Sequence, residues 1–297
     1  MSNRLSIFPY PYYVLTEDHP QISLPRNETH YILASNGVFI HKGSTDLQDK
    51  NSGLIESVTK VTGFQQSVNL PGLVPCETYA NVRVTKFPHK LAVTCQRFFS
   101  RVLRELSGES EIQLYYSQDI REFRLECPQQ QVSHGGVEYV RDLNGIFNTG
   151  NVKFARAGTI HSHCDFEAFH SGTDQDDEKH EDGLHITFGH VDKPDHGEPL
   201  SVVVSVVSNN HRFQMNPEHC IEGISFSSEK AEKGLWKKGN NTEKYYHLDS
   251  LSQDEEAEIS RQVDEWMPRV SVATYQRNKR SNRNTSRSGW TDKFIGG

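Results

Sequence analysis

Residues 154–174, FARAGTIHSHCDFEAFHSGTD, carry two histidines at the end of an apolar run and acidic side chains after it. The run FARAGTIHSH predicts a β-strand. Alternate residues of a strand point to one face, so His161 and His163 present two imidazoles about 7 Å apart along the backbone. One metal ion can bind both, and zinc accepts imidazole nitrogen and carboxylate oxygen. Spacing alone leaves four candidates for a third ligand, namely Asp165, Glu167, His170 and Asp174.

Outward from this strand, the chain predicts one α+β domain over residues 76–226. Apolar residues from Leu91 to Leu106 recur at steps of four, three, four and four, which predicts an amphipathic helix that starts at His89 and ends at Gly108. Further strands are expected at EIQLYYS (111–117), EFRLECP (122–128), VEYVRD (137–142), LHITFGHV (184–191) and PLSVVVSVV (199–207). Strand, long helix and several strands in this order predict a single sheet with helices packed on it.

Two flanking regions are expected on either side of this domain. Residues 1–75 predict a β-rich extension with a hairpin turn at Asn36-Gly37. Residues 227–297 predict a solvated acidic helix at QDEEAEISRQVDEWM (253–267), then a basic tail without a packed core. The composition of this tail favours a solubilising role over binding to nucleic acid. Its basic residues are Arg269, Arg277, Lys279, Arg280, Arg283, Arg287 and Lys293.

Charge and composition exclude several classes. A net charge of -7 argues against a nucleic-acid binder. No apolar stretch is long enough to span a membrane, so no membrane partner is expected. The five cysteines form no CxxC pair, which argues against a disulfide framework and a cysteine-based zinc site and predicts a cytoplasmic location.

Known HxH patterns complete the histidine pair in different ways. The metallo-β-lactamase pattern HxHxDH fails at Phe166. A cupin pattern could use Glu167, but its glycines and later histidine are not at the required spacing. The pattern HxH, seven residues, Ser, two residues, Asp fits at every position, through Ser171 to Asp174.

This spacing resembles that of the JAB/MPN/Mov34 metalloproteases, the JAMM-motif enzymes that hydrolyse isopeptide bonds to ubiquitin or ubiquitin-like proteins. The resemblance implies an MPN/JAB-like α+β fold, with one mixed sheet flanked by helices, and Zn²⁺ held by His161, His163 and Asp174. It also implies that Glu111, at the start of a strand after the long helix, acts as general base, with Glu109 as the neighbouring alternative. Ser171 would donate a hydrogen bond to the developing oxyanion.

The same resemblance implies the partners. The substrate would be a ubiquitin-like protein or its conjugates, and E1-like activating or E2-like conjugating proteins of the same system would be further partners. We expect the modifier's extended tail, ending in a small residue, to pair with an exposed strand edge beside HSH. A non-catalytic MPN-type scaffold is the alternative, although such scaffolds usually lack the metal ligands that this chain retains.

The chain departs from the family pattern in two places. Many eukaryotic relatives have proline after the second histidine, where this chain has Cys164, which we expect to be a buried structural cysteine. The acidic run DQDDEKHED (174–182) predicts a solvated loop in place of a helix and resembles the bacterial branch found beside ubiquitin-like conjugation genes.

Overall fold

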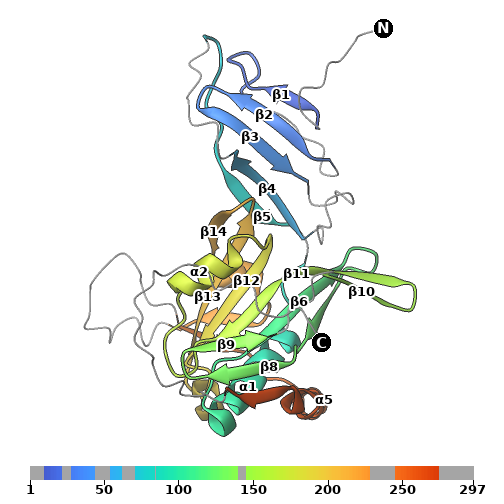
Figure 1. The fold of residues 1–297 in the computed structure, drawn as a ribbon, viewed down its shortest axis with the longest axis vertical. Helices are drawn as coiled ribbons and strands as arrows, with labels where there is room; N and C mark the ends of the chain where they lie inside the picture. Colours follow the sequence, from blue (N-terminus) through green and yellow to red (C-terminus); the bar gives the residue numbers. More distant parts are fainter. Residues whose placement is uncertain are drawn as a thin grey trace, which may run out of the picture.

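The computed structural model describes residues 10–21, 28–43, 54–61, 71–83, 85–139, 145–227 and 245–273. Of these residues, 43% lie in strands and 23% in helices. The described strands form three sheets, of five, nine and three strands, and the large sheet curls into a half-barrel (Figure 1). The predicted α+β fold, with one mixed sheet flanked by helices, is therefore wrong. Local periodicity identifies strands, but it does not determine which strands pair.

The five-stranded sheet is formed by the N-terminal part of the chain. In spatial order its strands are β1 (Tyr12–Val14), β2 (His30–Ala34), β3 (Gly37–Lys42), β4 (Ile55–Lys60) and β5 (Tyr79–Val82). The predicted hairpin is present between β2 and β3, but Ala34 pairs with Gly37, so the turn is Ser35-Asn36. Apolar side chains of the N-terminal part of the chain form a small core of their own, made of Leu15, Ile32, Ala34, Phe39 and Val58. The sheet extends past residue 75, and the proposed division of the chain remains a prediction.

Side-chain contacts attach this sheet to the large one. Ser57 Oγ lies 2.8 Å from Ser208 Oγ, and Asn209 Nδ2 donates to Thr59 Oγ1 at 2.7 Å. Leu54 and the start of β4 are also buried in the main core. The N-terminal sheet is therefore joined to the large sheet by both polar and apolar contacts.

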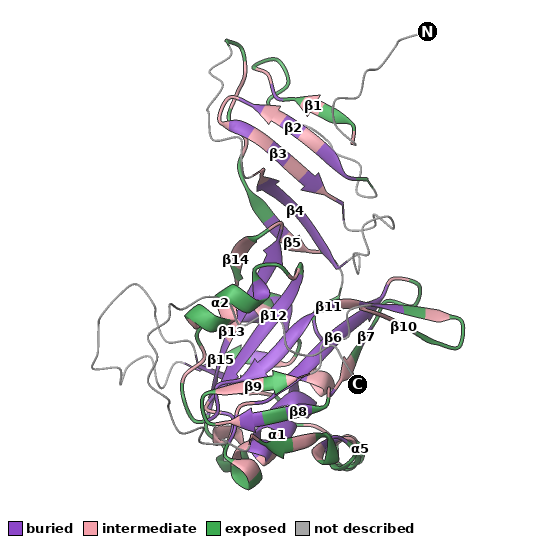
Figure 2. Ribbon diagram, viewed as in Figure 1, coloured by how far each residue is buried: buried purple, intermediate pink, exposed green. Residues whose placement is uncertain are grey.

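The nine-stranded sheet holds the main core. Seven strands follow the order β15 (Ile224–Phe226), β16 (Tyr245–Leu248), β13 (Leu200–Ser208), β12 (Gly183–Gly189), β11 (Val152–Ser162), β6 (Glu111–Ser117) and β7 (Glu122–Glu126). Two more pair beside them, β10 (Ile146–Thr149) with β11 and β14 (His211–Met215) with β13. Every residue of β6 and β12 is buried, which places these strands at the centre of the molecule (Figure 2).

The predicted long helix is confirmed as α1 (His89–Leu106). It starts directly after Pro88, whose fixed φ suits a helix start. It ends at Ser107, which takes the left-handed conformation usually left to glycine and donates its N–H to the Leu103 carbonyl. Phe98, Phe99 and Val102 lie on its buried face, and the Phe99 ring lies 6.1 Å from that of Phe188 in β12.

The acidic C-terminal helix packs against α1. It is α5 (Gln253–Trp266), and it begins with a capping box between Ser252 and Glu255. The prediction of a solvated helix is wrong for one face, because Ile259, Val263 and Trp266 are buried there. The Trp266 and Phe98 rings meet edge to face, with their centroids 5.5 Å apart.

The remaining elements are short. The three-stranded sheet has the order β17 (Val270–Val272), β8 (Gln130–Ser133) and β9 (Gly136–Tyr139). The short helices are α2 (Gly172–Glu178), η2 (Lys193–His196), α3 (Pro217–Cys220) and η3 (Met267–Arg269). Because β17 follows α5 along the chain, it ties the β8–β9 hairpin to the C-terminal helix.

The cysteines, the helices and the basic tail each bear on a prediction from the sequence. All five cysteines are free thiols, and four of them are buried. No helix in the described ranges has the length and apolar character needed to cross a membrane. Most of the basic tail, residues 274–297, lies outside the described residues.

Candidate metal centre

His161 lies in the interior of the large sheet, near the end of β11. It is in register with Thr187 of the parallel strand β12 and with Glu111 of the antiparallel strand β6. Both edges of β11 are therefore occupied beside the histidines. The expected exposed strand edge beside HSH is absent, and an extended peptide cannot pair there.

The chain turns sharply just after the second histidine. The His163 N–H donates to the Phe188 carbonyl at 2.8 Å, which extends the pairing with β12. Cys164 then adopts a φ of 52°, in the left-handed region. Proline cannot adopt this conformation, because its ring fixes φ near −65°. The buried cysteine is confirmed, and burial raises the pKa of its thiol to about 12.

The spacing Ser-x-x-Asp forms a capping box at the start of α2. Ser171 Oγ accepts the Asp174 N–H at 3.1 Å, and Asp174 Oδ2 accepts the Ser171 N–H at 2.8 Å. This reciprocal pair satisfies two N–H groups that a helix start leaves without partners. It also fixes the direction of the Asp174 carboxylate. The prediction of a loop over the acidic run is wrong for residues 174–178, which belong to α2.

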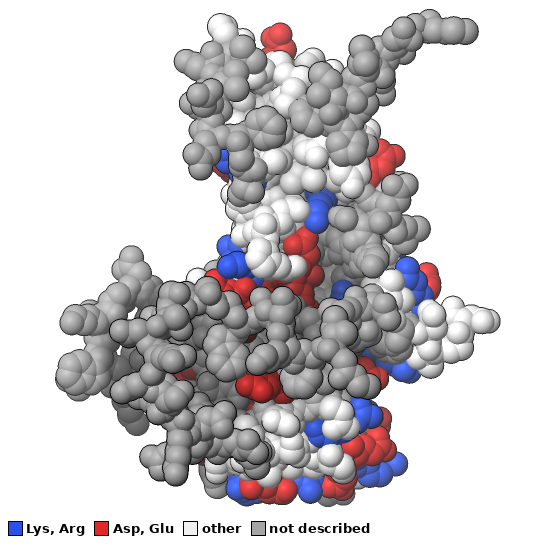
Figure 3. Space-filling view, viewed as in Figure 1, with Lys and Arg blue, Asp and Glu red and all other residues white. Residues whose placement is uncertain are grey.

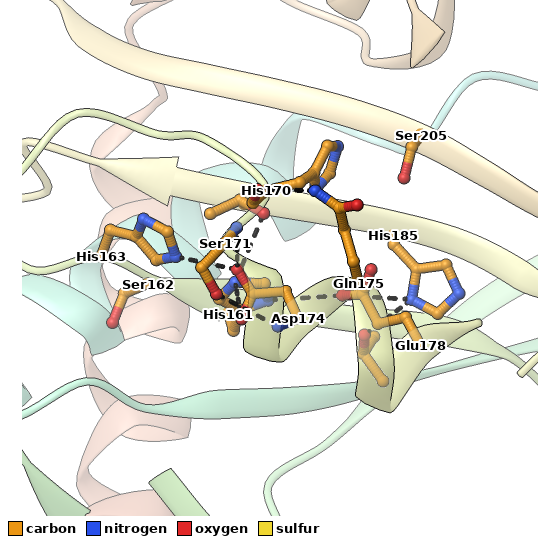
Figure 4. A network of polar contacts seen from close by, with 12 residues as sticks. His161, Ser162, His163, His170, Ser171, Asp174, Gln175, Glu178, His185 and Ser205 are labelled. Atoms are coloured by element: carbon orange, nitrogen blue, oxygen red, sulfur yellow. Dashed lines mark hydrogen bonds and ion pairs between the residues drawn. The ribbon is translucent and has the colours of Figure 1, made fainter. Parts of the chain in front are cut away.

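The structure brings His161, His163 and Asp174 together, with one ligand atom from each lying within 4.8 Å of the others (Figure 4). Asp174 Oδ2 lies 3.3 Å from His163 Nε2, and Asp174 Oδ1 lies 3.7 Å from His161 Nε2. Ligand atoms of a tetrahedral zinc site lie roughly 3.3 Å apart, because each bond is about 2.0 Å long. Two imidazoles and one carboxylate at these separations fit a zinc ion with one position left open.

Electrostatics favour a charged Asp174. Burial alone would raise its pKa, but hydrogen bonds with His161 and His163 outweigh burial and hold the pKa far below its usual range. Burial likewise opposes a charge on His161, but the Asp174 carboxylate outweighs it and raises the pKa of that imidazole. The carboxylate is therefore ionised and ready to bind a cation.

The other three candidates for the third ligand lie outside this cluster. Asp165 is exposed. The Glu167 carboxylate accepts a hydrogen bond from Tyr245 Oη at 2.7 Å, while its backbone carbonyl lies 3.3 Å from His163 Nδ1. The ring of His170 faces Arg212, with His170 Nδ1 3.3 Å from Arg212 Nη1. Tertiary structure thus selects Asp174 from a set that spacing left open.

Glu111 is buried opposite His161, and the side chain of Gln130 holds its backbone. The Glu111 N–H donates to Gln130 Oε1, and Gln130 Nε2 donates to the Glu111 carbonyl, each at 2.9 Å. Burial outweighs a hydrogen bond with Tyr139 and raises the pKa of Glu111 to about 7, and among the described residues its Oε1 has no hydrogen-bond partner. Glu109 lies two residues earlier and is only half-buried, and its pKa is also raised by burial. Both carboxylates line the same pocket.

This pocket has a volume of about 780 Å³ and a strongly acidic wall. Among the described residues its lining includes no Lys or Arg, and its carboxylates are Glu109, Glu111, Glu138, Asp174, Asp177, Glu178 and Glu181. Phe166 and Phe169 are about half exposed and form an apolar part of its wall. In the space-filling view, acidic side chains gather in the middle of the face, between the N-terminal sheet and the main body (Figure 3).

A second layer of polar residues lies behind His161 and was not predicted from the sequence. Glu178 lies one helical turn after Asp174 and contacts His185 of β12 (Figure 4). It also pairs with Arg212 of β14. The four-residue interval could have indicated Glu178 if a helix had been expected there. Nothing in the sequence indicates Arg212, because only the pairing of β14 with β13 brings it close.

Comparison with known proteins does not extend these observations: no protein-family model matches the chain, and no curated protein matches it.

Proposed function

We propose that the chain is a zinc-dependent isopeptidase of the JAMM-motif type, which removes or processes a ubiquitin-like modifier after a small C-terminal residue. One observation carries the proposal: His161, His163 and Asp174 converge in a pocket that Glu111 and Ser171 also line. The HxHx7SxxD spacing supports the same chemistry. The proposal concerns this site only, since the sheets do not follow the fold that the resemblance implied.

The two histidines and the aspartate would hold the zinc ion. When bound, zinc acts as a Lewis acid and makes water available as a nucleophile near neutral pH. The protein's own contribution is to hold two Nε2 atoms and one carboxylate oxygen in place before binding. Preorganised ligands of this kind lower the entropic cost of capturing the ion.

Glu111 is our candidate general base. Its carboxylate takes a proton from the attacking water while the water oxygen forms a bond to the carbonyl carbon of the substrate. The same carboxyl group then returns the proton to the leaving nitrogen as the C–N bond breaks, so a lysine ε-amine departs as a neutral amine. A buried carboxylate with an unpartnered Oε1 and a pKa raised to about 7 suits both steps near neutral pH.

Ser171 is our candidate for stabilising the oxyanion. Its Oγ accepts the Asp174 N–H, so its own hydroxyl proton remains available to donate, and the residue lines the pocket. A hydrogen bond to the negative oxygen of the tetrahedral intermediate would lower the barrier by roughly 3 kcal/mol.

The modifier's tail would approach along β9. Within the described residues, β9 pairs only with β8, so its outer edge can accept an extended chain by strand addition. All of β9, Gly136 to Tyr139, lines the pocket. Small residues at the end of the tail would pass between Phe166, Phe169 and His134 more easily than bulky ones. Conjugates of a ubiquitin-like protein are the substrates that this geometry favours.

Cleavage of modifier fusions tests the proposal. Ubiquitin-like proteins carrying a short C-terminal peptide, and lysine conjugates of the same proteins, are incubated with the zinc-loaded chain. We expect cleavage after glycine, loss of cleavage with a zinc chelator, and no effect of thiol alkylation. Equal cleavage when Phe replaces the terminal glycine would contradict tail threading, and loss of activity on alkylation would contradict the metal mechanism.

The non-catalytic scaffold makes the opposite prediction. A scaffold would bind the modifier without cutting any fusion or conjugate, even with one zinc per chain. Binding without cleavage, measured on the same panel, would therefore replace the isopeptidase with the scaffold.

A further inference from the structure

His161 lies between two carboxylates of one short helix. Its Nε2 is 3.7 Å from Asp174 Oδ1, and its Nδ1 is 3.7 Å from Glu178 Oε1. Asp174 and Glu178 lie four residues apart in α2, so they project from the same side of the helix. The imidazole therefore faces the metal ligand with one nitrogen and a second carboxylate with the other (Figure 4).

Arg212 holds Glu178 in place from β14. Arg212 Nη2 donates to Glu178 Oε2 at 2.6 Å, and Arg212 Nη1 donates to Ser205 Oγ at 2.6 Å. Glu178 is buried, and the guanidinium compensates its charge. The ion pair occupies Oε2 and leaves Oε1 directed toward His161.

His185 lies near the same oxygen but has no proton to offer it. Its Nε2 lies 2.9 Å from the Glu181 carbonyl, which can only accept, so Nε2 carries the proton of the neutral ring. Its Nδ1 then accepts from the Thr159 hydroxyl at 2.9 Å. Among the described residues around Oε1, His161 is thus the donor.

We propose that Glu178 is a positioning residue that accepts the Nδ1–H of His161 and so directs the Nε2 lone pair toward the metal. The Nδ1 of His163 also faces an acceptor, in this case the backbone carbonyl of Glu167 at 3.3 Å. A carboxylate behind a metal-bound histidine fixes its tautomer and ring orientation and increases its basicity as a ligand. The inference rests on the zinc site of the proposed function and does not depend on which bond is cut.

Zinc affinity and cobalt spectra test this role without any substrate. Glu178→Ala and Glu178→Gln are compared with Asp176→Asn, a control on the same helix whose exposed carboxylate pairs with Lys179. We expect the Glu178→Ala dissociation constant for zinc to rise about 10- to 100-fold, as for other such partners. Glu178→Gln should show a smaller rise, because its amide oxygen still accepts the hydrogen bond without the charge.

The visible absorption of bound Co²⁺ separates positioning from folding. A weakened fold would reduce the amount of metal-binding protein, but the folded fraction would keep its spectrum. We expect a shifted cobalt band in Glu178→Ala and an unchanged one in Asp176→Asn. Wild-type affinity and spectrum in both Glu178 variants would overturn the inference.

Nuclear magnetic resonance of the wild-type protein provides a test that needs no variant. Imidazole ¹⁵N shifts of the zinc-loaded chain should show His161 bound through Nε2 and protonated at Nδ1. Binding through Nδ1 would overturn the inference. Absence of stoichiometric zinc in the wild-type chain would instead contradict the metal site itself, whereas tight zinc binding without hydrolysis would contradict only the proposed function.

Discussion

Ser171 and Asp174 bond each other reciprocally at the first turn of α2, and the same aspartate faces both histidines of the candidate metal centre. One carboxylate therefore caps the helix and completes the ligand set. The interval of three residues between Ser and Asp is the interval of a capping box. The start of α2 therefore orients the Asp174 carboxylate toward the two histidines.

Replacing Ser171 should separate its two roles. We expect Ser171→Ala to lower the free energy of unfolding by about 1 kcal/mol through loss of the cap. Hydrolysis should fall further, by about 100-fold or more, through loss of the oxyanion donor. Ser252→Ala is the matched control, since Ser252 caps α5 in the same way and lies outside the pocket lining. Equal hydrolysis by the two variants would limit Ser171 to capping.

Metal analysis tests the ligand set. We expect one zinc per chain in the wild type and a loss of stoichiometric zinc in the double variant His161→Ala with His163→Ala, and in Asp174→Ala. His180→Ala is the control, because His180 is exposed and contacts Asn210. Full zinc retention in the double variant, measured by atomic emission, would show that the metal binds elsewhere.

Glu111 and Glu109 are distinguished by paired amide substitutions. Glu111→Gln should retain zinc but lower the rate of hydrolysis about 10²- to 10⁴-fold, because a general base is lost and a ligand is not. Glu109→Gln should retain most activity, since its half-buried carboxylate is not the predicted base. The reverse result would assign the base to Glu109. Alternate residues of a strand share one face, so the pocket geometry would stay the same.

The free energy of unfolding should decrease as pH falls, because the histidines behind the site take up protons when the chain unfolds. Burial, followed by the charge of Arg212, lowers the pKa of His170 from 6.5 to about 4, and burial also lowers the pKa of His185. Between pH 6.5 and about 4 the unfolded chain therefore binds protons that the folded chain does not. The free energy of unfolding should decrease as pH falls through this window, by at most about 1.4 kcal/mol per pH unit for each histidine.

Urea unfolding of the metal-free protein at several pH values measures this slope. His170→Asn should flatten it, whereas the exposed His180→Asn should leave it unchanged. An unchanged slope in His170→Asn would mean that His170 does not contribute to the pH dependence.

Several elements could be predicted from the sequence because their signals are local. The spacing of apolar residues predicts where α1 lies in the sequence. Composition and periodicity predict the strands at residues 111–117 and 184–189. The motif HxHx7SxxD likewise selected His161, His163 and Asp174, which the fold brings together. Helix α2 was not predicted, because its residues form no apolar stripe. It is stabilised by a capping box and by the contacts of Glu178.

What the sequence by itself determined is therefore several of the strands, the long helix and the residues of the candidate metal cluster. Only the tertiary structure decided that the strands divide into three sheets, that both edges of β11 are occupied, and that Arg212 lies behind His161 through Glu178. The physical reason is the distance along the chain over which each interaction acts. Periodicity and capping depend on residues within a few positions of each other, whereas strand pairing depends on which distant segments bury their apolar faces together.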